Sequence, residues 1–211
     1  NSASVSTDNI SRVFEDRAGG LWVTTFRGVS YCAPKHQRFR RYQHEPGNPN
    51  SLGDNSVRAI CEDAAGILWV GTEKGLNKVD RARGQITRYQ HDPEDSTSLS
   101  SGLWIGTIVE DAEHGLWVGT WGGELCCYDP ESERFWRPGD DPAFPRIRDT
   151  LAICRDHNWN IWVGDYNQGL YCFVNPAGAG RQGTAQPRVV HYAHDPDDPH
   201  SLSHNVVRAL F

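Results

Sequence analysis

The chain has 211 residues, of which 37% are hydrophobic, enough for one domain with a substantial core. Its formal net charge of -6 is not offset by any basic run, which argues against nucleic acid or an anionic membrane surface as the partner. No apolar stretch reaches the roughly 18 residues that a membrane-spanning helix needs, so we expect no membrane span in this chain.

One stretch recurs four times along the chain. The copies read EDRAGGLWVTT from Glu15, EDAAGILWVGT from Glu62, EDAEHGLWVGT from Glu110 and, most loosely, RDHNWNIWVGD from Arg155. Their tryptophans lie 47, 48 and 45 residues apart, at Trp22, Trp69, Trp117 and Trp162. A period in this range indicates a repeat architecture.

Each repeat is expected to form four short strands. In the second copy, runs rich in Val, Ile, Leu, Trp and Tyr are separated by Gly, Asp and Asn, and they predict strands at 56–63, 67–72, 76–80 and 86–91. No segment has a helical hydrophobic period of useful length. Four strands with a period near 45 are typical of a β-propeller blade. We therefore predict an all-β fold of about four propeller blades.

The chain order predicts how the blades divide the sequence. The ending SHNVVRALF matches GDNSVRAIC at the start of the second blade, which predicts the first strand of a fifth blade and a fragment of a larger propeller. The segment NPAGAGRQGTAQP, 175–187, is expected to be a mobile loop. The expected divisions are 1–7 disordered or linker, 8–53 blade one, 54–101 blade two, 102–146 blade three, 147–203 blade four and 204–211 the next strand.

The repeated Asp and Trp have a structural explanation that needs no ligand. An Asp at the head of a tight turn can accept backbone N–H groups, and a large indole can fill the space between neighbouring blades. The aspartates at this position are Asp16, Asp63, Asp111 and Asp156. A structural role is favoured over a catalytic one, and no catalytic residue is assigned.

The six cysteines align with apolar core positions of other repeats and lack zinc-ligand spacing. Buried free thiols are the favoured interpretation, with a disulfide as the alternative. Neither a cofactor motif nor a metal motif is found, so no cofactor and no metal are predicted.

The chain resembles the two-component regulator propeller repeat from residue 8 to residue 211. The features that carry this resemblance are HDPEDSTSLS followed by EDAAGILWVGTEKGLNKVD, and the fourth copy departs from the pattern where Thr is replaced by Asp165. The resemblance implies the periplasmic sensor region of a bacterial inner-membrane receptor, commonly a hybrid histidine kinase. It also implies recognition of carbohydrate fragments in some members.

The predicted ligand site lies on the loop face of the propeller. Three of the four residues that follow the second strand are aromatic, at a turn that ordinarily favours small or polar residues. Aromatic rings can stack on sugar C–H surfaces, and polar side chains beside them can bind hydroxyl groups. The candidate residues are Phe26, Trp121, Tyr166 and Trp104, with Arg27, Arg58, Lys74, Asn167 and Gln168. The alternative is that these aromatic rings cap the blade cores.

Two other polar patterns have ordinary explanations. A histidine recurs at one loop position, where a turn-stabilising hydrogen bond is favoured over a metal ring. Acidic runs such as Asp92, Glu94 and Asp95, repeated at Asp195, Asp197 and Asp198, fit solvated loops better than a weak calcium site.

Three functions compete. The favoured one is a ligand-sensing module without enzymatic activity, whose partners are an oligosaccharide or small molecule and either the remaining blades of the parent chain or a second copy. The alternatives are a protein-interaction or assembly scaffold and, with less support, a propeller lyase or hydrolase, since propellers host both.

Overall fold

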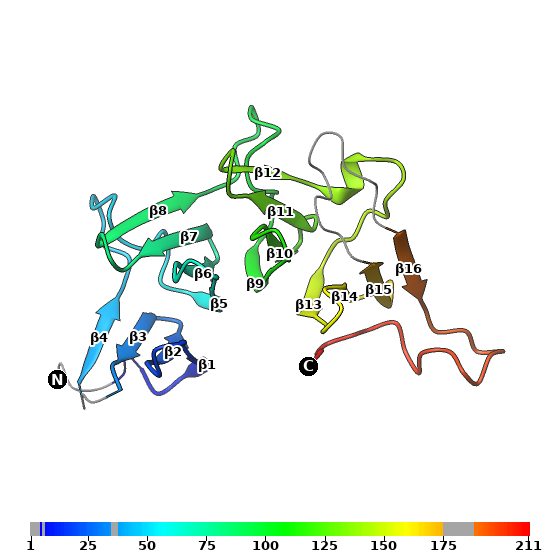
Figure 1. Cartoon of the computed structure of the whole chain (residues 1–211), viewed down its shortest axis with the longest axis horizontal. Helices are drawn as coiled ribbons and strands as arrows, with labels where there is room; N and C mark the ends of the chain where they lie inside the picture. The colour runs from blue at the N-terminus through cyan, green and yellow to red at the C-terminus, as the bar shows by residue number, and fades with distance from the viewer. Residues whose placement is uncertain (1–4, 6, 35–37, 175–187) are drawn as a thin grey trace. The chain divides into compact units, whose positions relative to one another are not determined.

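The computed structural model describes residues 5, 7–34, 38–174 and 188–211. It contains four sheets of four antiparallel strands, each in simple sequence order (Figure 1), as predicted for propeller blades. The chain divides into two compact units, residues 1–90 and 91–211. The mobile loop expected at 175–187 lies outside the described residues. No helix in the described ranges has the length and apolar character that a membrane crossing requires.

The first unit contains two sheets, β1-β2-β3-β4 and β5-β6-β7-β8. Its strands are β1 (Ile10–Glu15), β2 (Leu21–Thr25), β3 (Gly28–Cys32), β4 (Phe39–Tyr42), β5 (Val57–Glu62), β6 (Leu68–Thr72), β7 (Gly75–Asp80) and β8 (Gln85–Tyr89). The strands of the second sheet begin and end within two residues of their predicted bounds. Hydrophobic runs and turn residues were therefore sufficient to locate them.

The second unit also contains two sheets, β9-β10-β11-β12 and β13-β14-β15-β16. Its elements are β9 (Trp104–Glu110), β10 (Leu116–Trp121), β11 (Cys126–Asp129), β12 (Arg134–Trp136), the 3-10 helix η1 (Pro138–Asp140), β13 (Thr150–Arg155), β14 (Ile161–Asp165), β15 (Leu170–Val174) and β16 (Arg188–Tyr192).

The repeated Asp and Trp are bound to each other in every blade. In the second blade one oxygen of Asp63 accepts the backbone N–H groups of Ala65 and Ile67 at 3.0 and 2.9 Å. The other oxygen accepts the indole N–H of Trp69 at 2.8 Å. The same indole bond measures 2.9, 3.2 and 2.9 Å in the pairs Asp16–Trp22, Asp111–Trp117 and Asp156–Trp162. One carboxylate thus closes the turn and orients the indole.

Each unit has a core shared by its two blades. In the first unit the inner strand β5 packs against β1 and β2, and one buried cluster contains Trp22, Leu52 from the link between the blades and Val57 of the next blade. In the second unit β13 packs against β9 and β10, and Trp117 contacts Phe173 with ring centroids 4.7 Å apart. Trp22 and Trp117 therefore fill the space between the two blades of their own units, as predicted, whereas Trp162 is only half-buried.

The histidine-containing loops are held by local hydrogen bonds. The ring Nδ1–H of His44 donates to the Leu52 carbonyl at 2.8 Å, and Ser51 Oγ accepts the Glu45 N–H at 2.9 Å. His91 and His194 repeat the bond to Leu99 and Leu202 at 3.0 and 2.7 Å. The turn-stabilising role predicted for the histidines is thus confirmed.

The acidic runs form capped turns. Oδ1 of Asp92 accepts the Glu94 N–H at 3.0 Å, and Oδ1 of Asp195 accepts the Asp197 N–H at 3.0 Å. Within the described part of the chain, no group of three or more His, Cys, Asp or Glu side chains is arranged to hold a metal ion.

The cysteines and the last segment differ in part from expectation. All six cysteines are free, and burial raises the pKa of the Cys126 and Cys127 thiols. Three of them are only half-buried: Cys32, Cys61 and Cys154. Residues 204–211, predicted as the first strand of a next blade, form no ladder with the described strands. They are joined to the fourth blade by backbone bonds from Val207 N to Asp165 O and from Gly169 N to Asn205 O.

Candidate ligand-binding site

Most of the predicted site residues lie at the turn between the second and third strands of a blade, whereas Arg58 and Trp104 lie on the inner strands β5 and β9. In the first blade, Thr25 Oγ1 donates to the Gly28 carbonyl and accepts the Arg27 N–H, both at 3.0 Å. The hydroxyl therefore closes the turn, and Phe26 and Arg27 lie at its tip. In the second blade the same turn needs Gly75, whose φ is +119° and whose Cβ would lie 2.2 Å from the Tyr89 carbonyl oxygen.

The fourth blade closes this turn with Asp165 in place of Thr. Its Oδ1 accepts the backbone N–H groups of Asn167 and Gln168 at 2.7 and 2.8 Å. The residue is 1% exposed, and burial raises the pKa of its carboxyl group. The departure from the repeat pattern therefore preserves the turn, and Tyr166 is displayed at its tip.

Three of the predicted aromatic residues lie together in the second unit. Trp104 and Trp121 face each other across β9 and β10, with ring centroids 5.5 Å apart and planes inclined by 4°. Tyr166 meets Trp121 edge-on, with centroids 5.0 Å apart and planes at 77°. We call these three residues the aromatic cluster. Both contact types are favoured geometries for aromatic pairs.

Asp149 links the two turns that carry the aromatic cluster. Its backbone oxygen accepts the N–H of Tyr166 at 3.2 Å, and its Oδ1 accepts the N–H of Gly122 at 2.7 Å. Its own φ is 53°, in the left-handed region that few residues other than glycine adopt. Sequence reasoning missed this residue, because its partners lie on turns that are far from it in the chain.

The stacking limits which surfaces of the aromatic cluster a ligand can reach. Trp104 and Trp121 each cover one face of the other, and both are half-buried. Tyr166 is 38% exposed, so its ring and hydroxyl are the most accessible part of the aromatic cluster. The stacked faces of the two indoles therefore cover each other, while the Tyr166 ring stays exposed.

The two polar residues after Tyr166 differ in their surroundings. The Asn167 side chain lies on the exposed part of the turn. In contrast, Gln168 Oε1 accepts the Tyr171 hydroxyl at 2.6 Å, and its carbonyl oxygen accepts the His191 Nε2–H at 2.5 Å. Gln168 therefore connects the turn to the strands β15 and β16 by hydrogen bonds.

The equivalent turns of the first unit form a charged cluster. The guanidinium of Arg58 lies 5.3 Å from the centroid of the Phe26 ring, which is 48% exposed. Arg58 Nη2 also pairs with Glu73 Oε1 at 2.9 Å, and the Ser56 hydroxyl donates to the same oxygen at 2.8 Å. These two hydrogen bonds, first the one from Arg58, lower the pKa of Glu73. We call Phe26, Arg58 and Glu73 the charged cluster.

The other predicted residues of the first unit are Arg27 and Lys74. Arg27 is exposed, and its carbonyl oxygen accepts a hydrogen bond from Gln43 Nε2 at 2.7 Å. Lys74 Nζ lies 3.7 Å from Asp54 Oδ2, a loose pair on an exposed side chain. The nine predicted residues therefore fall into two groups, one in each unit.

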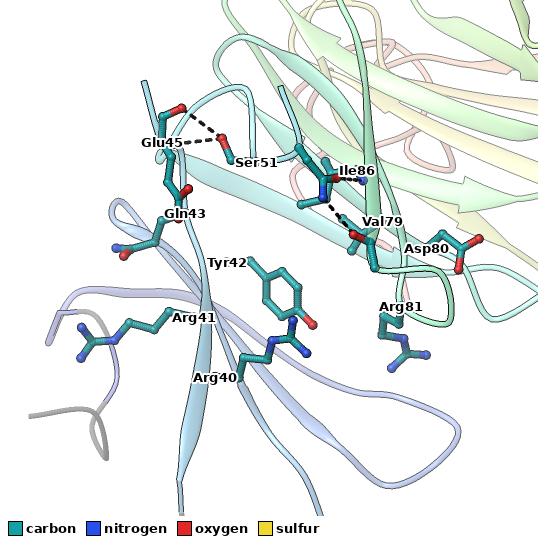
Figure 2. A pocket seen from close by; sticks show the side chains of 12 residues that line it. Arg40, Arg41, Tyr42, Gln43, Glu45, Ser51, Val79, Asp80, Arg81 and Ile86 are labelled. Atoms are coloured by element: carbon teal, nitrogen blue, oxygen red, sulfur yellow. Dashed lines mark hydrogen bonds between the residues drawn. The ribbon is translucent and has the colours of Figure 1, made fainter. Parts of the chain in front are cut away.

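A cavity of about 190 Å³ lies in the first unit, between β4 and the turn from β7 to β8. Figure 2 shows side chains that line it. Arg40 lies 5.2 Å above the Tyr42 ring, whereas Arg41 points to the other side of β4 (Figure 2). Arg81, on the opposite wall, pairs with the buried carboxylates of Asp16, at 2.6 Å, and Glu62. The Arg81 guanidinium thus forms ion pairs with a carboxylate of each blade and joins the two blades. We therefore assign this cavity a structural role and no ligand.

Comparison with known proteins supports the sequence interpretation. The family model described as two component regulator propeller matches residues 51–74. A comparison with curated proteins finds no match.

Several solved structures share the fold. The extracellular domain of BT4673 from B. thetaiotaomicron, described as a hybrid two component system, has 20% sequence identity and a TM-score of 0.73 over 99% of this chain and 26% of its own. The corresponding domain of BT3049 from B. thetaiotaomicron has 19% identity and a TM-score of 0.62 over 98% of this chain and 38% of its own.

An enzyme matches as well. Virginiamycin B lyase from Staphylococcus aureus has 12% identity and a TM-score of 0.62 over 90% of this chain and 57% of its own. At these identities the likeness shows the fold, and the chain spans about a quarter of the BT4673 domain. The chain is a fragment of a larger β-propeller, and it carries the two component regulator propeller repeat that its sequence predicts.

Proposed function

We propose that the chain is part of the sensor region of a bacterial two-component-type receptor. In this proposal the propeller lies on the extracytoplasmic side of the inner membrane and binds a carbohydrate or another small ligand on its loop face. Support comes from the repeat at residues 51–74 and from the likeness to extracellular domains of two component systems.

The observation that carries the ligand proposal is the aromatic cluster. Its three rings come from two neighbouring blades, and the backbone of both turns is fixed by Asp149. A sugar can stack its C–H face on an accessible ring, while the Tyr166 hydroxyl and the Asn167 amide offer hydrogen bonds to its hydroxyl groups. A rigid site of this kind binds without losing much side-chain entropy.

The acidic residues next to the aromatic cluster favour binding over catalysis. Asp165 uses Oδ1 to accept two backbone N–H groups, and Asp149 accepts one with its side chain and one with its backbone oxygen. Both therefore serve to hold turns. The lyase alternative is supported by fold likeness alone.

The experiment that tests this proposal compares the aromatic cluster with the exposed aromatic ring of the other unit. Tryptophan fluorescence and calorimetry would measure binding of a panel of neutral oligosaccharides to the protein and to Trp121→Ala, Tyr166→Ala and Phe26→Ala. We expect the first two variants to lose at least about tenfold in affinity, which corresponds to about 1.4 kcal/mol. Phe26→Ala is the matched control and should bind with nearly unchanged affinity.

Circular dichroism must show that each variant remains folded. Affinities that stay the same in Trp121→Ala and Tyr166→Ala would contradict the proposed site. Turnover of an oligosaccharide in the same assays would instead support the enzyme alternative.

A further inference from the structure

A second cavity, of about 360 Å³, adjoins the turn that begins at Trp121. It lies within the second unit, between this turn, the link that precedes β9 and the segment that leads into β13. Polar and charged groups dominate its lining, which includes His91, Ser100, Gly123, Arg137, Arg146 and Arg148. None of these residues belongs to the aromatic cluster.

The backbone around this cavity is firmly held. A Cβ on Gly123 would lie 1.6 Å from the Ser101 carbonyl oxygen, so only glycine allows the turn to approach the link so closely. Leu125 N donates to the Ile147 carbonyl at 2.9 Å, and Glu124 forms a backbone bridge with Arg148. The arginines that follow η1 are thus presented from a fixed backbone.

The cavity carries one more positive charge than its carboxylates neutralise. Glu124 Oε1 lies 3.2 Å from Arg148 Nη2 and 3.7 Å from Arg146 Nη1, so one carboxylate faces two guanidinium groups. Arg137 pairs separately with Asp140 at 3.7 Å. With His91 neutral, three arginines and two carboxylates leave a single positive charge among the lining residues.

The two guanidinium groups that share Glu124 remain open to solvent. The side chains of Arg146 and Arg148 are 64% and 61% exposed, whereas Glu124 is 17% exposed. A guanidinium has five N–H donors in a fork that matches a carboxylate, and these contacts use few of them. The side chain of Glu124 already shows which group this pair of arginines receives.

We propose that the cavity is an anion site that takes the carboxylate of an acidic sugar through Arg146 and Arg148. This inference deepens the proposed ligand-sensing function, on which it rests: a sugar ring at Trp121 and a carboxylate in the cavity would be held by one turn. The incoming carboxylate supplies the negative charge that the lining lacks, and it competes with Glu124 for the same donors.

Calorimetry with a galacturonate trimer and a neutral galactose trimer, at low ionic strength, tests the proposal. We expect the acidic trimer to bind at least about tenfold more tightly, and we expect this preference to disappear in Arg148→Gln and Arg146→Gln. Glu124→Gln should instead raise the affinity for the acidic trimer, because it removes the competing carboxylate. Arg83→Gln, which changes an exposed ion-paired arginine of the first unit, is the matched control and should leave the preference intact.

The outcomes separate this proposal from the proposed function. Equal affinities for both trimers, lost in Trp121→Ala, would overturn the anion site and leave the ligand-sensing function standing. A preference for the acidic trimer that persists in Trp121→Ala would retain the anion site and count against the aromatic cluster. If the folded protein and Glu124→Gln bind neither trimer, the anion site is wrong, and the carbohydrate proposal loses its support as well.

Discussion

The turn between the second and third strands carries different side-chain chemistry in the two units. In the first unit, the residues after the second strands are Phe26 and Glu73, and Arg58 contacts both of them. In the second unit, the corresponding residues are Trp121 and Tyr166, which contact each other, and Trp121 also stacks on Trp104. The charged cluster thus pairs its two charged side chains with each other, whereas the aromatic cluster contains no charged side chain. A repeat fold can therefore keep its turn geometry while changing the chemistry that the turn displays.

The two units share one structural feature, the hydrogen-bonded Asp–Trp pair of each blade. In each blade the indole N–H donates a hydrogen bond to the Asp that closes the first turn. The indole is buried in the first three blades and half-buried in the fourth. The comparison therefore predicts that stability resides in the repeated pair and that binding resides in the variable turn.

The largest expected effect is the loss of stability when a buried indole is removed from the core. Trp22 is fully buried and is hydrogen-bonded to Asp16, so Trp22→Ala should lower the free energy of unfolding by about 3–5 kcal/mol. Trp121→Ala, at a half-buried position, should cost clearly less. Urea unfolding followed by circular dichroism measures both changes. Equal losses would mean that the aromatic cluster is as much a part of the core as Trp22.

A smaller effect distinguishes the two clusters by their response to salt. A double-mutant cycle of Arg58→Ala and Glu73→Ala should give a coupling energy of about 0.5–1 kcal/mol that falls in concentrated salt, because both side chains are partly exposed. The cycle of Trp121→Ala and Tyr166→Ala should give about 0.5–1.5 kcal/mol with little salt dependence. A salt-independent Arg58–Glu73 coupling would show that the pair is not held by charge.

The smallest effects are expected from pH, and they have opposite signs at two aspartates of the second unit. The indole hydrogen bond of Trp162 is the main cause that lowers the pKa of Asp156 to about 2 from 3.8. Its stabilising contribution is therefore complete above pH 3.8 and is lost as the pH falls through 2. Burial raises the pKa of Asp165, so its contribution is complete below pH 3.8 and is lost as the pH rises through its folded-state pKa.

Unfolding measured against pH checks both signs. Asp156→Asn should flatten the loss of stability in acid, and Asp165→Asn should flatten the loss at higher pH. Carboxyl chemical shifts from NMR titration would report the two pKa values directly. A folded-state pKa of Asp165 at or below 3.8 would contradict the second expectation.

Much of the fold could be predicted because its determinants are local. The Asp and Trp of each repeat are six residues apart, and the loop histidine binds a carbonyl eight residues away, so both patterns recur wherever the same short sequence occurs. The spacing of these motifs was therefore sufficient to predict four-stranded blades. Residues 204–211, predicted as the first strand of a next blade, form no ladder within the described chain, since a ladder also requires a partner strand.

The sequence predicted which positions belong to the candidate site, but it did not predict the contacts between them. The repeat alignment identified Phe26, Trp121 and Tyr166 as displayed residues, but it did not indicate which neighbours they contact. Trp104 and Tyr166 meet Trp121 from different blades, and Arg58 neutralises Glu73 from another strand.

The sequence by itself determined the period, the strands and the turn positions, because these depend on hydrogen bonds and packing between residues close in the chain. Only the tertiary structure decided that one unit presents a charged cluster and the other an aromatic cluster beside an arginine-lined cavity. Contacts such as Glu124 with Arg148, and Asp149 with Gly122, join residues more than twenty positions apart. Their geometry follows from how the blades pack against each other, which no single repeat encodes.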